Sequence, residues 1–198
     1  MLHGKLKRIA LIGLCAGGVL AAAYVGLAAW SMHDDIGVAI LAITTDDSYP
    51  GIPKPLAEAY LRYGHYDPNS LLPRRGPPAF YFICAGYGMV NTQNGKVLEL
   101  SSLLAHRGAD VNAAFDGLTS LHGAIIANEP GLVRHLLALG ADSRVRVMPS
   151  GKPYDGMTAL ELARYFSSRK NRDLREVIAI LEQVQHNRPM QPTAASGG

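Results

Sequence analysis

Cysteine and histidine are the residues of this chain that could serve as nucleophile, general base or metal ligand. The sequence holds two cysteines and seven histidines, and no pair of histidines has metal-ligand spacing with a third ligand behind it. Cys84 and His122 are the only nucleophile and base that a repeat fold could bring near each other, and both have structural explanations. We therefore expect no catalytic residue, no metal and no cofactor.

Other signatures of chemistry are missing from the sequence. There is no Gly-x-Ser-x-Gly, no phosphate-binding glycine loop and no His-Glu-x-x-His. The formal charge of +3 comes from Lys5, Lys7 and Arg8, and the chain beyond residue 30 carries 16 basic and 16 acidic residues. A neutral main part gives no case for nucleic-acid binding. We expect neither nucleic acid nor a small-molecule substrate as the ligand.

A membrane segment is expected at residues 9–30. This run of 22 residues has no charge, and about 20 apolar residues suffice for a helix to cross a bilayer. The basic residues in the preceding tail, 1–8, place that tail in the cytoplasm and residues 31–198 outside. A cleaved signal peptide is the alternative, because small residues at 21–23 suit a signal peptidase.

The main part contains an internal repeat. Gly108–Asp110 recurs as Gly140–Asp142, and Asp116–Thr119 recurs in type as Asp155–Thr158. Each Asp-Gly-x-Thr element opens an apolar helix, for which its threonine is a good N-cap. A second apolar helix precedes each Gly-Ala-Asp, where the glycine can end it in a left-handed conformation. Self-similarity at this period indicates a repeat architecture.

These elements resemble the ankyrin repeat. Thr119–His122 matches the Thr-Pro-Leu-His element of that family with Ser120 in place of proline, and Gly108–Asn112 matches its Gly-Ala-Asp-Val-Asn. The resemblance covers 50–184 and implies an all-α solenoid of about four repeats, the first of them degenerate. It also implies that His122 forms hydrogen bonds between repeats. Residues 31–49 are expected as a linker or N-terminal cap and 185–198 as a disordered tail.

One connection is longer than the family pattern. We call residues 143–154 the finger; its Arg-Val alternation followed by Pro-Ser-Gly predicts two short strands and a turn, a β-hairpin-like insertion. The alternative is a tolerated surface insertion. Protein binding is expected on the finger and neighbouring loop tips, at Phe115, Asp116, Arg144, Arg146, Tyr154 and Asp155. The tyrosines between Tyr60 and Tyr87 are the alternative surface.

Charge is unevenly distributed along the main part. Residues 31–142 carry a net −4 and residues 143–175 a net +5, a division that could orient a charged partner. The alternative is that these charges are solvated helix faces.

The expected setting is the bacterial inner membrane, with a single pass and the bulk of the chain in the periplasm. The family resemblance suggests an immunity protein that binds and neutralises a toxic effector. The alternatives are a catalase-associated periplasmic ankyrin protein that supports peroxide resistance, and a scaffold for a membrane complex. An enzyme hidden in the irregular 31–80 region is the competing class.

Overall fold

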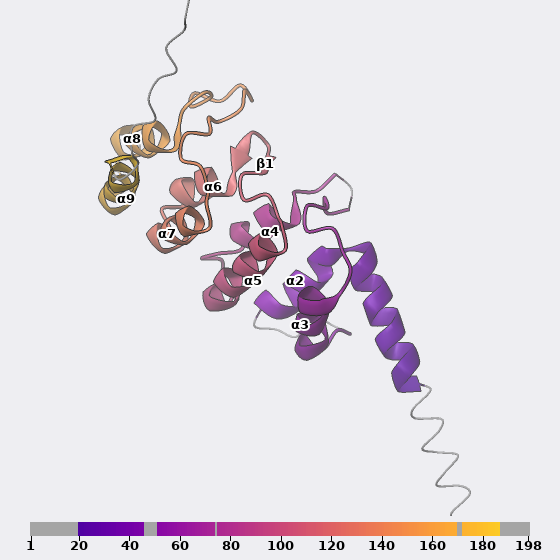
Figure 1. The fold of residues 1–198 in the computed structure, drawn as a ribbon. Helices are drawn as coiled ribbons and strands as arrows, with labels where there is room; N and C mark the ends of the chain where they lie inside the picture. The colour runs from indigo at the N-terminus through magenta and orange to yellow at the C-terminus, as the bar shows by residue number, and fades with distance from the viewer. Residues whose placement is uncertain (1–19, 46–50, 74, 170–171, 187–198) are drawn as a thin grey trace, which may run out of the picture.

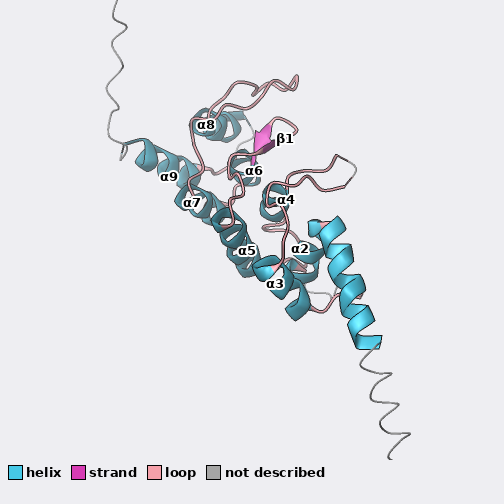
Figure 2. Cartoon of the chain, turned by 45° about the vertical axis from the view of Figure 1, so that its right-hand side comes forward, coloured by secondary structure: helices cyan, strands magenta, loops and turns pink. Residues whose placement is uncertain are grey.

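A computed structural model describes residues 20–45, 51–73, 75–169 and 172–186 of the chain. In these residues the protein is mostly helical (Figures 1 and 2). A helix covering Leu20–Asp34 comes first. It is followed by α2 (Ile36–Thr44), α3 (Lys54–Tyr63), α4 (Ala79–Ala85), α5 (Asn94–His106), β1 (Ala114–Phe115), β2 (Leu118–Thr119), α6 (Ser120–Ala127), α7 (Pro130–Ala138), α8 (Ala159–Arg169) and α9 (Arg175–His186).

The helices from α2 onward pack in pairs. Each of α2, α4, α6 and α8 contacts the helix that follows it, and α2, α4, α6 and α8 also contact one another in that order. The pairs follow one another from the N-terminal to the C-terminal end of the molecule (Figure 1). One row of fully buried side chains runs through the pairs and forms the core: Ile40, Leu61, Ile83, Leu104, Leu121, Leu136, Leu162 and Leu181.

Local signals explain where two of these helices begin. The Thr119 hydroxyl accepts the His122 N–H, and the His122 ring reaches back to the Thr119 N–H, which completes a capping box. Thr158 and Glu161 repeat the arrangement before α8, where the glutamate accepts both the Thr158 N–H and its hydroxyl. Each box satisfies amide groups that a helix leaves unpaired at its first turn.

The turns that end successive pairs share one hydrogen-bond pattern. In three of them an aspartate accepts the backbone N–H two residues later: Asp67 from Asn69, Asp110 from Asn112 and Asp142 from Arg144. The turns are also joined to each other. Asn69 Oδ1 accepts the N–H of Asp110 at 2.7 Å, and Asn112 Oδ1 accepts the N–H of Asp142 at 2.8 Å. An asparagine side chain in each of these two turns thus fixes the distance to the next turn along the chain.

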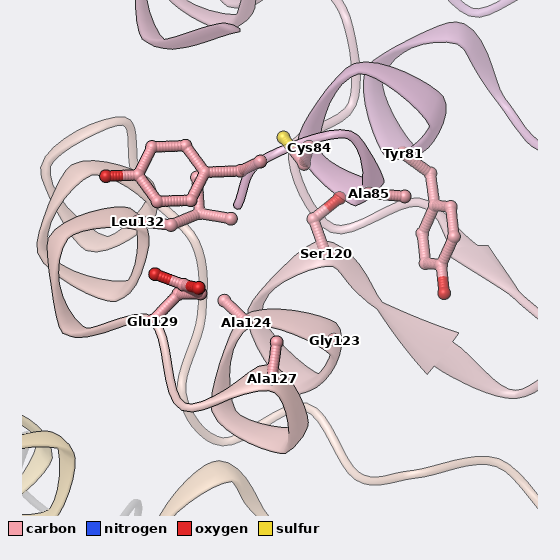
Figure 3. Close-up of a pocket in the computed structure, with 10 residues that line it drawn as sticks. Tyr81, Cys84, Ala85, Ser120, Gly123, Ala124, Ala127, Glu129 and Leu132 are labelled. Atoms are coloured by element: carbon pink, nitrogen blue, oxygen red, sulfur yellow. The ribbon is translucent and has the colours of Figure 1, made fainter. Parts of the chain in front are cut away.

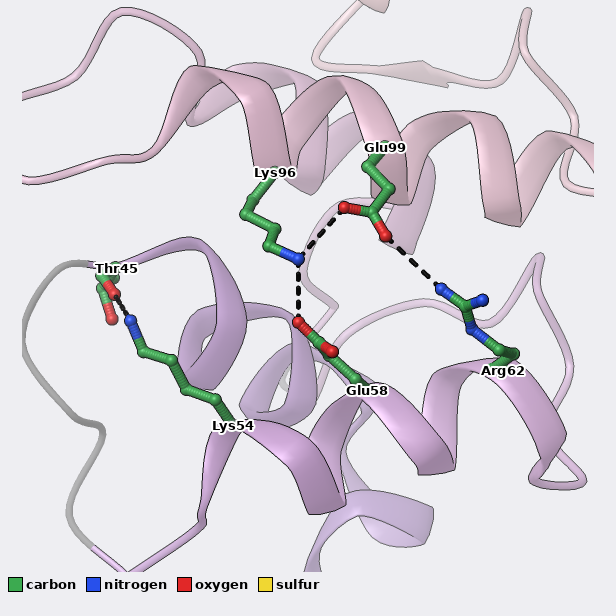
Figure 4. Close-up of polar contacts among 6 residues, drawn as sticks. All are labelled: Thr45, Lys54, Glu58, Arg62, Lys96 and Glu99. Carbon is green, nitrogen blue, oxygen red and sulfur yellow. Dashed lines mark hydrogen bonds and ion pairs between the residues drawn. The ribbon is translucent and has the colours of Figure 1, made fainter.

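Polar contacts join α3 to α5. Lys96 lies between Glu58 at 2.9 Å and Glu99 at 3.1 Å, and Arg62 reaches Glu99 (Figure 4). These pairs are partly exposed, so each contributes little to stability. Arg107 is held more tightly: it donates to three carbonyl oxygens at the C-terminal end of α3 and its guanidinium lies 4.5 Å from the centre of the Tyr66 ring.

One expectation needs revision. The two strands predicted within the finger do not form; the hairpin of the described residues is β1–β2, and the finger is irregular. The reason is that Val147 and Met148 bond to different partners, Val147 to Met157 and Met148 to Gly117, so no ladder develops. Of the stretch 31–49, expected as a linker or N-terminal cap, the structure describes residues 31–45, and these include α2, whose apolar side chains are buried against α3.

The ends of the chain lie largely outside the described residues. This holds for residues 1–8, for 9–19 of the expected membrane segment and for 187–198 of the expected tail. No single helix of the described part has the length and apolar character needed to cross a bilayer. Leu20–Asp34 and Ile36–Thr44 meet both criteria only when taken together, and they bend by 107° relative to each other.

Candidate protein-binding surface

The finger is closed at its base by backbone hydrogen bonds. Val147 donates to the Met157 carbonyl at 2.9 Å, and the Gly156 N–H donates to the Val147 carbonyl at 2.8 Å. Met148 donates to the Gly117 carbonyl at 2.9 Å, which attaches the finger to the turn between β1 and β2. Figures 1 and 2 show the finger and the hairpin projecting from the same side of the row of helices.

The tip of the finger is organised by one carboxylate. Asp155 accepts the backbone N–H groups of Ser150, Gly151 and Lys152 at 2.7, 2.7 and 3.1 Å, and also the Ser150 hydroxyl. These bonds stabilise the charged form and hold the pKa of Asp155 below its ordinary value. Gly151 has a φ of 79°, a conformation that side chains other than glycine rarely adopt. The tip is therefore ordered by internal bonds.

An ion pair crosses from the finger to the hairpin. Lys152 Nζ lies 2.8 Å from the Asp116 carboxylate, and this contact raises the pKa of Lys152. Asp116 and Gly117 have φ values of 48° and 79°, as a two-residue hairpin turn with both central residues left-handed requires. Beside them the Phe115 ring lies 5.7 Å from the Tyr81 ring of α4. Finger, hairpin and α4 form one continuous surface.

The six residues expected to bind a partner divide into two groups. Phe115, Asp116, Arg144 and Arg146 are exposed, whereas Tyr154 and Asp155 are half-buried. Arg144 is turned back onto Asp142, and Arg146 donates to the Gly156 carbonyl at 2.7 Å and lies near Glu161. The Tyr154 ring packs on Phe166 and Tyr165, and so holds the finger against α8.

Two residues that the sequence did not single out belong to this surface. Met148 lies in the finger with 51% of its area exposed, and Lys152 makes the cross-link to the hairpin. The sequence did offer one indication for Met148. It directly precedes Pro-Ser-Gly, so it stands at the start of a turn, where an apolar side chain is not buried as it would be in a core strand.

His122 supports the finger from below. Its Nε2 lies 3.1 Å from the Val145 carbonyl oxygen, and its Nδ1 lies 3.2 Å from the Thr119 backbone nitrogen. Because Nδ1 must accept from that N–H, Nε2 carries the proton and donates to Val145. Burial lowers the pKa of His122, since the charged ring would lose its hydration. The side chain thus joins α6 to the finger.

In the part of the chain that the structure describes, Cys84 has no base beside it. Both His122 nitrogens are engaged with Thr119 and Val145, and burial raises the pKa of the Cys84 thiol to about 12 with the Ser120 hydroxyl opposing the rise. The thiol therefore stays protonated at neutral pH and packs in the core of α4. Nowhere in the described part of the chain do three histidine, cysteine or acidic side chains gather as metal ligands would.

A cleft lies between α4 and α6, next to Tyr81. Its volume is about 160 Å³, and its lining comes from α4, the turn after α4, α6 and the start of α7 (Figure 3). Tyr81 therefore borders both this cleft and the surface formed by the finger and hairpin.

Comparison with known proteins gave no relative: no family model matches the sequence, and no curated protein matches it.

Proposed function

We propose that this chain is an ankyrin-repeat protein of the bacterial inner membrane that binds another protein in the periplasm through the finger and the β1–β2 hairpin. The observation that carries the proposal is the internal bonding of the finger. Asp155, Lys152 and the Val147 backbone bonds hold an exposed loop in one conformation without a partner. A loop ordered in advance loses less conformational entropy on binding.

The ankyrin assignment is supported by the repeated details. Helix pairs, threonine-capped first helices, and asparagine bonds between successive turns all recur along the chain. On this assignment the repeats are α2–α3, α4–α5, α6–α7 and α8–α9. The first repeat would then begin near Asp35, whose carboxylate caps α2, upstream of the boundary expected at residue 50.

The surface has the residue types of a protein interface. Arg144 and Arg146 expose their side chains by 68% and 64%, and Met148 and Phe115 add apolar area beside them. Arginine and aromatic side chains are enriched among the residues that dominate binding energy, and methionine adapts to varied partners. Binding alone needs no catalytic group, which suits an immunity protein that blocks a toxic effector.

The membrane assignment rests on the uncharged segment 9–30 and on the exposed apolar residues in the described part of that segment. Tyr24, Leu27 and Trp30 expose apolar surface on Leu20–Asp34, while Ala28 and Met32 on the same helix are buried. Tyrosine and tryptophan favour the boundary between lipid and water. We infer that this helix passes from the bilayer directly into contact with the folded part, where the Tyr24 hydroxyl donates to the Gly51 carbonyl.

The test is crosslinking in living cells. A photoreactive phenylalanine analogue replaces Met148 on the finger, and in the control chain it replaces Tyr63, which is 76% exposed on α3. We expect one covalent adduct with a second protein at Met148 and none at Tyr63. Adducts at Tyr63 but not at Met148 would move the interface to the tyrosine-rich region, and adducts at neither would refute protein binding by these surfaces.

The adduct also tests the immunity role. Its partner is identified by mass spectrometry, and that protein is then expressed in the periplasm of cells with and without this chain. An immunity role requires that the partner be toxic alone and harmless when this chain is present. A partner that is harmless alone would leave protein binding in place and remove the immunity role.

A further inference from the structure

We propose that the cleft between α4 and α6 receives an arginine side chain of the partner protein. This inference rests on the proposed protein-binding function and names the chemistry of the partner. The cleft volume of about 160 Å³ suits a single side chain. It opens beside Tyr81, whose ring contacts Phe115 of the hairpin, so a partner seated on the finger can reach it.

The walls of the cleft are small and apolar. Ala85 comes from α4, Gly123, Ala124 and Ala127 come from α6, and Leu132 comes from α7 (Figure 3). Small side chains on facing helices leave the space that makes the cleft. The stem of an arginine, with its three methylene groups, is the kind of surface that such walls cover well.

An unpaired carboxylate lies in this cleft. Glu129 is half-buried, and among the described residues its side chain makes no hydrogen bond or ion pair, not even the cap of α7 that its position would allow. Its Oε1 lies against Gly88, where a Cβ atom would come within 2.5 Å of it. Gly88 has a φ of 76°, which favours glycine, and the absence of a Cβ atom leaves room for the carboxylate. A partly buried carboxylate without a partner favours a cation.

Other groups around the cleft favour arginine over lysine. Tyr81 and Tyr87 contribute ring surface, on which a planar guanidinium can stack. The guanidinium can also form two parallel bonds to the Glu129 carboxylate, whereas an ammonium is a single point charge.

Among the described residues, no cation of this chain pairs with Glu129. Arg172 approaches the same end of α6, but it donates to the Ile126 and Ala127 carbonyls, and no ion pair joins it to Glu129 within the described residues. Residues 31–142, which supply every residue lining the cleft, carry a net −4. The Glu129 carboxylate and the net negative charge of the surrounding part of the chain therefore both favour a basic side chain in the cleft.

The probe for this site is arginine itself, as N-acetyl-arginine methylamide, with the citrulline analogue as an uncharged match of nearly equal shape. The full-length chain is held in detergent micelles with its alanine methyl groups labelled with carbon-13. Ala85, Ala124 and Ala127 place labelled methyl groups in the cleft walls. We expect saturable shifts at these methyl groups with the arginine probe, and about tenfold weaker binding of the citrulline probe, as loss of one charge-assisted bond implies.

Two variants decide the role of the carboxylate. Glu129→Gln should remove the preference for arginine while the remote alanine signals stay in place. Glu182→Gln, which removes an exposed carboxylate paired with Arg164 on α8, should keep the preference. Equal shifts with both probes, or an unchanged preference in Glu129→Gln, would overturn the arginine site. Crosslinking at Met148 is independent of this titration, so failure of the cleft proposal and failure of protein binding can be told apart.

Discussion

His122→Ala should both destabilise the protein and loosen the finger. The ring is 1% exposed and connects the Thr119 N–H to the Val145 carbonyl. Loss of the capping box costs about 1 kcal/mol. The Val145 carbonyl, deprived of its donor, adds about 1–3 kcal/mol for an unsatisfied partly buried group. The free energy of unfolding should therefore fall by about 2–4 kcal/mol.

The measurement is chemical denaturation of the full-length chain in mild detergent, followed by circular dichroism. Hydrogen exchange read by mass spectrometry adds the local view, and peptides covering the finger should exchange faster while those of α3 and α5 do not. His106→Ala is the matched control, because His106 is exposed and bonds only within its own helix to Ser102. His106→Ala should lower the free energy of unfolding by less than about 0.5 kcal/mol.

The reasoning would be refuted by two results. If His122→Ala and His106→Ala cost the same, burial and bonding of His122 do not contribute as the geometry implies. If His122→Ala destabilises the chain but leaves exchange in the finger unchanged, then the bond to Val145 does not hold the finger, and the stability loss belongs to α6 alone.

Three further predictions follow. Leu121→Ala should lower the free energy of unfolding by about 2–5 kcal/mol, as for other buried leucines, because Leu121 is 2% exposed; denaturation that shows no loss would contradict its place in the core. Stability should fall as the pH drops through the unfolded histidine pKa of about 6.5, because burial lowers the folded pKa of His122 and His135 and protonation then favours the unfolded chain. Denaturation midpoints that do not change between pH 7 and pH 5 would oppose this. Changing Arg144 and Arg146 together to glutamate should leave the fold intact and lower the crosslinking yield at Met148, and an unchanged yield would remove both arginines from the interface.

The parts of the fold that could be predicted from sequence are those with local physical causes. Thr119 and Thr158 cap helices through residues three positions away, and Gly108 and Gly140 adopt φ values of 93° and 96° after α5 and α7. Such signals act within one turn of chain, so they can be recognised without knowledge of the tertiary structure.

The parts that were missed depend on distant residues. Helix α2 follows an apolar segment directly, and its sequence shows no polar face from which a separate helix could be recognised; only its burial against α3 identifies it as core. The Arg-Val alternation of the finger is typical of a strand, but Val147 and Met148 at its end donate their N–H groups to different partners, Met157 and Gly117, and Asp155 binds the N–H groups that follow, from Ser150 onward. Tertiary bonds decided the local conformation there.

The cleft could not have been inferred in the same way. Its carboxylate comes from Glu129, its rings from Tyr81 and Tyr87, and its floor from α6, and no short motif connects these positions. In the sequence Glu129 is one acid in a polar turn, with nothing to distinguish it from a solvated charge. Its significance arises only because folding leaves it half-buried without a cation.

The distribution of charge on this chain suits both proposed contacts to a single partner. Tyr81 borders the cleft on one side and Phe115 of the hairpin on the other, so both contacts can be made by one partner. The cleft lies in the acidic part of the chain, whereas the finger begins the part from 143 to 175, which carries a net +5. A partner that presents an arginine to Glu129 and acidic groups to Arg144 and Arg146 would meet attraction at both contacts in one orientation and repulsion in the reverse one. Such a charge division sets orientation and partner choice, which area alone cannot do.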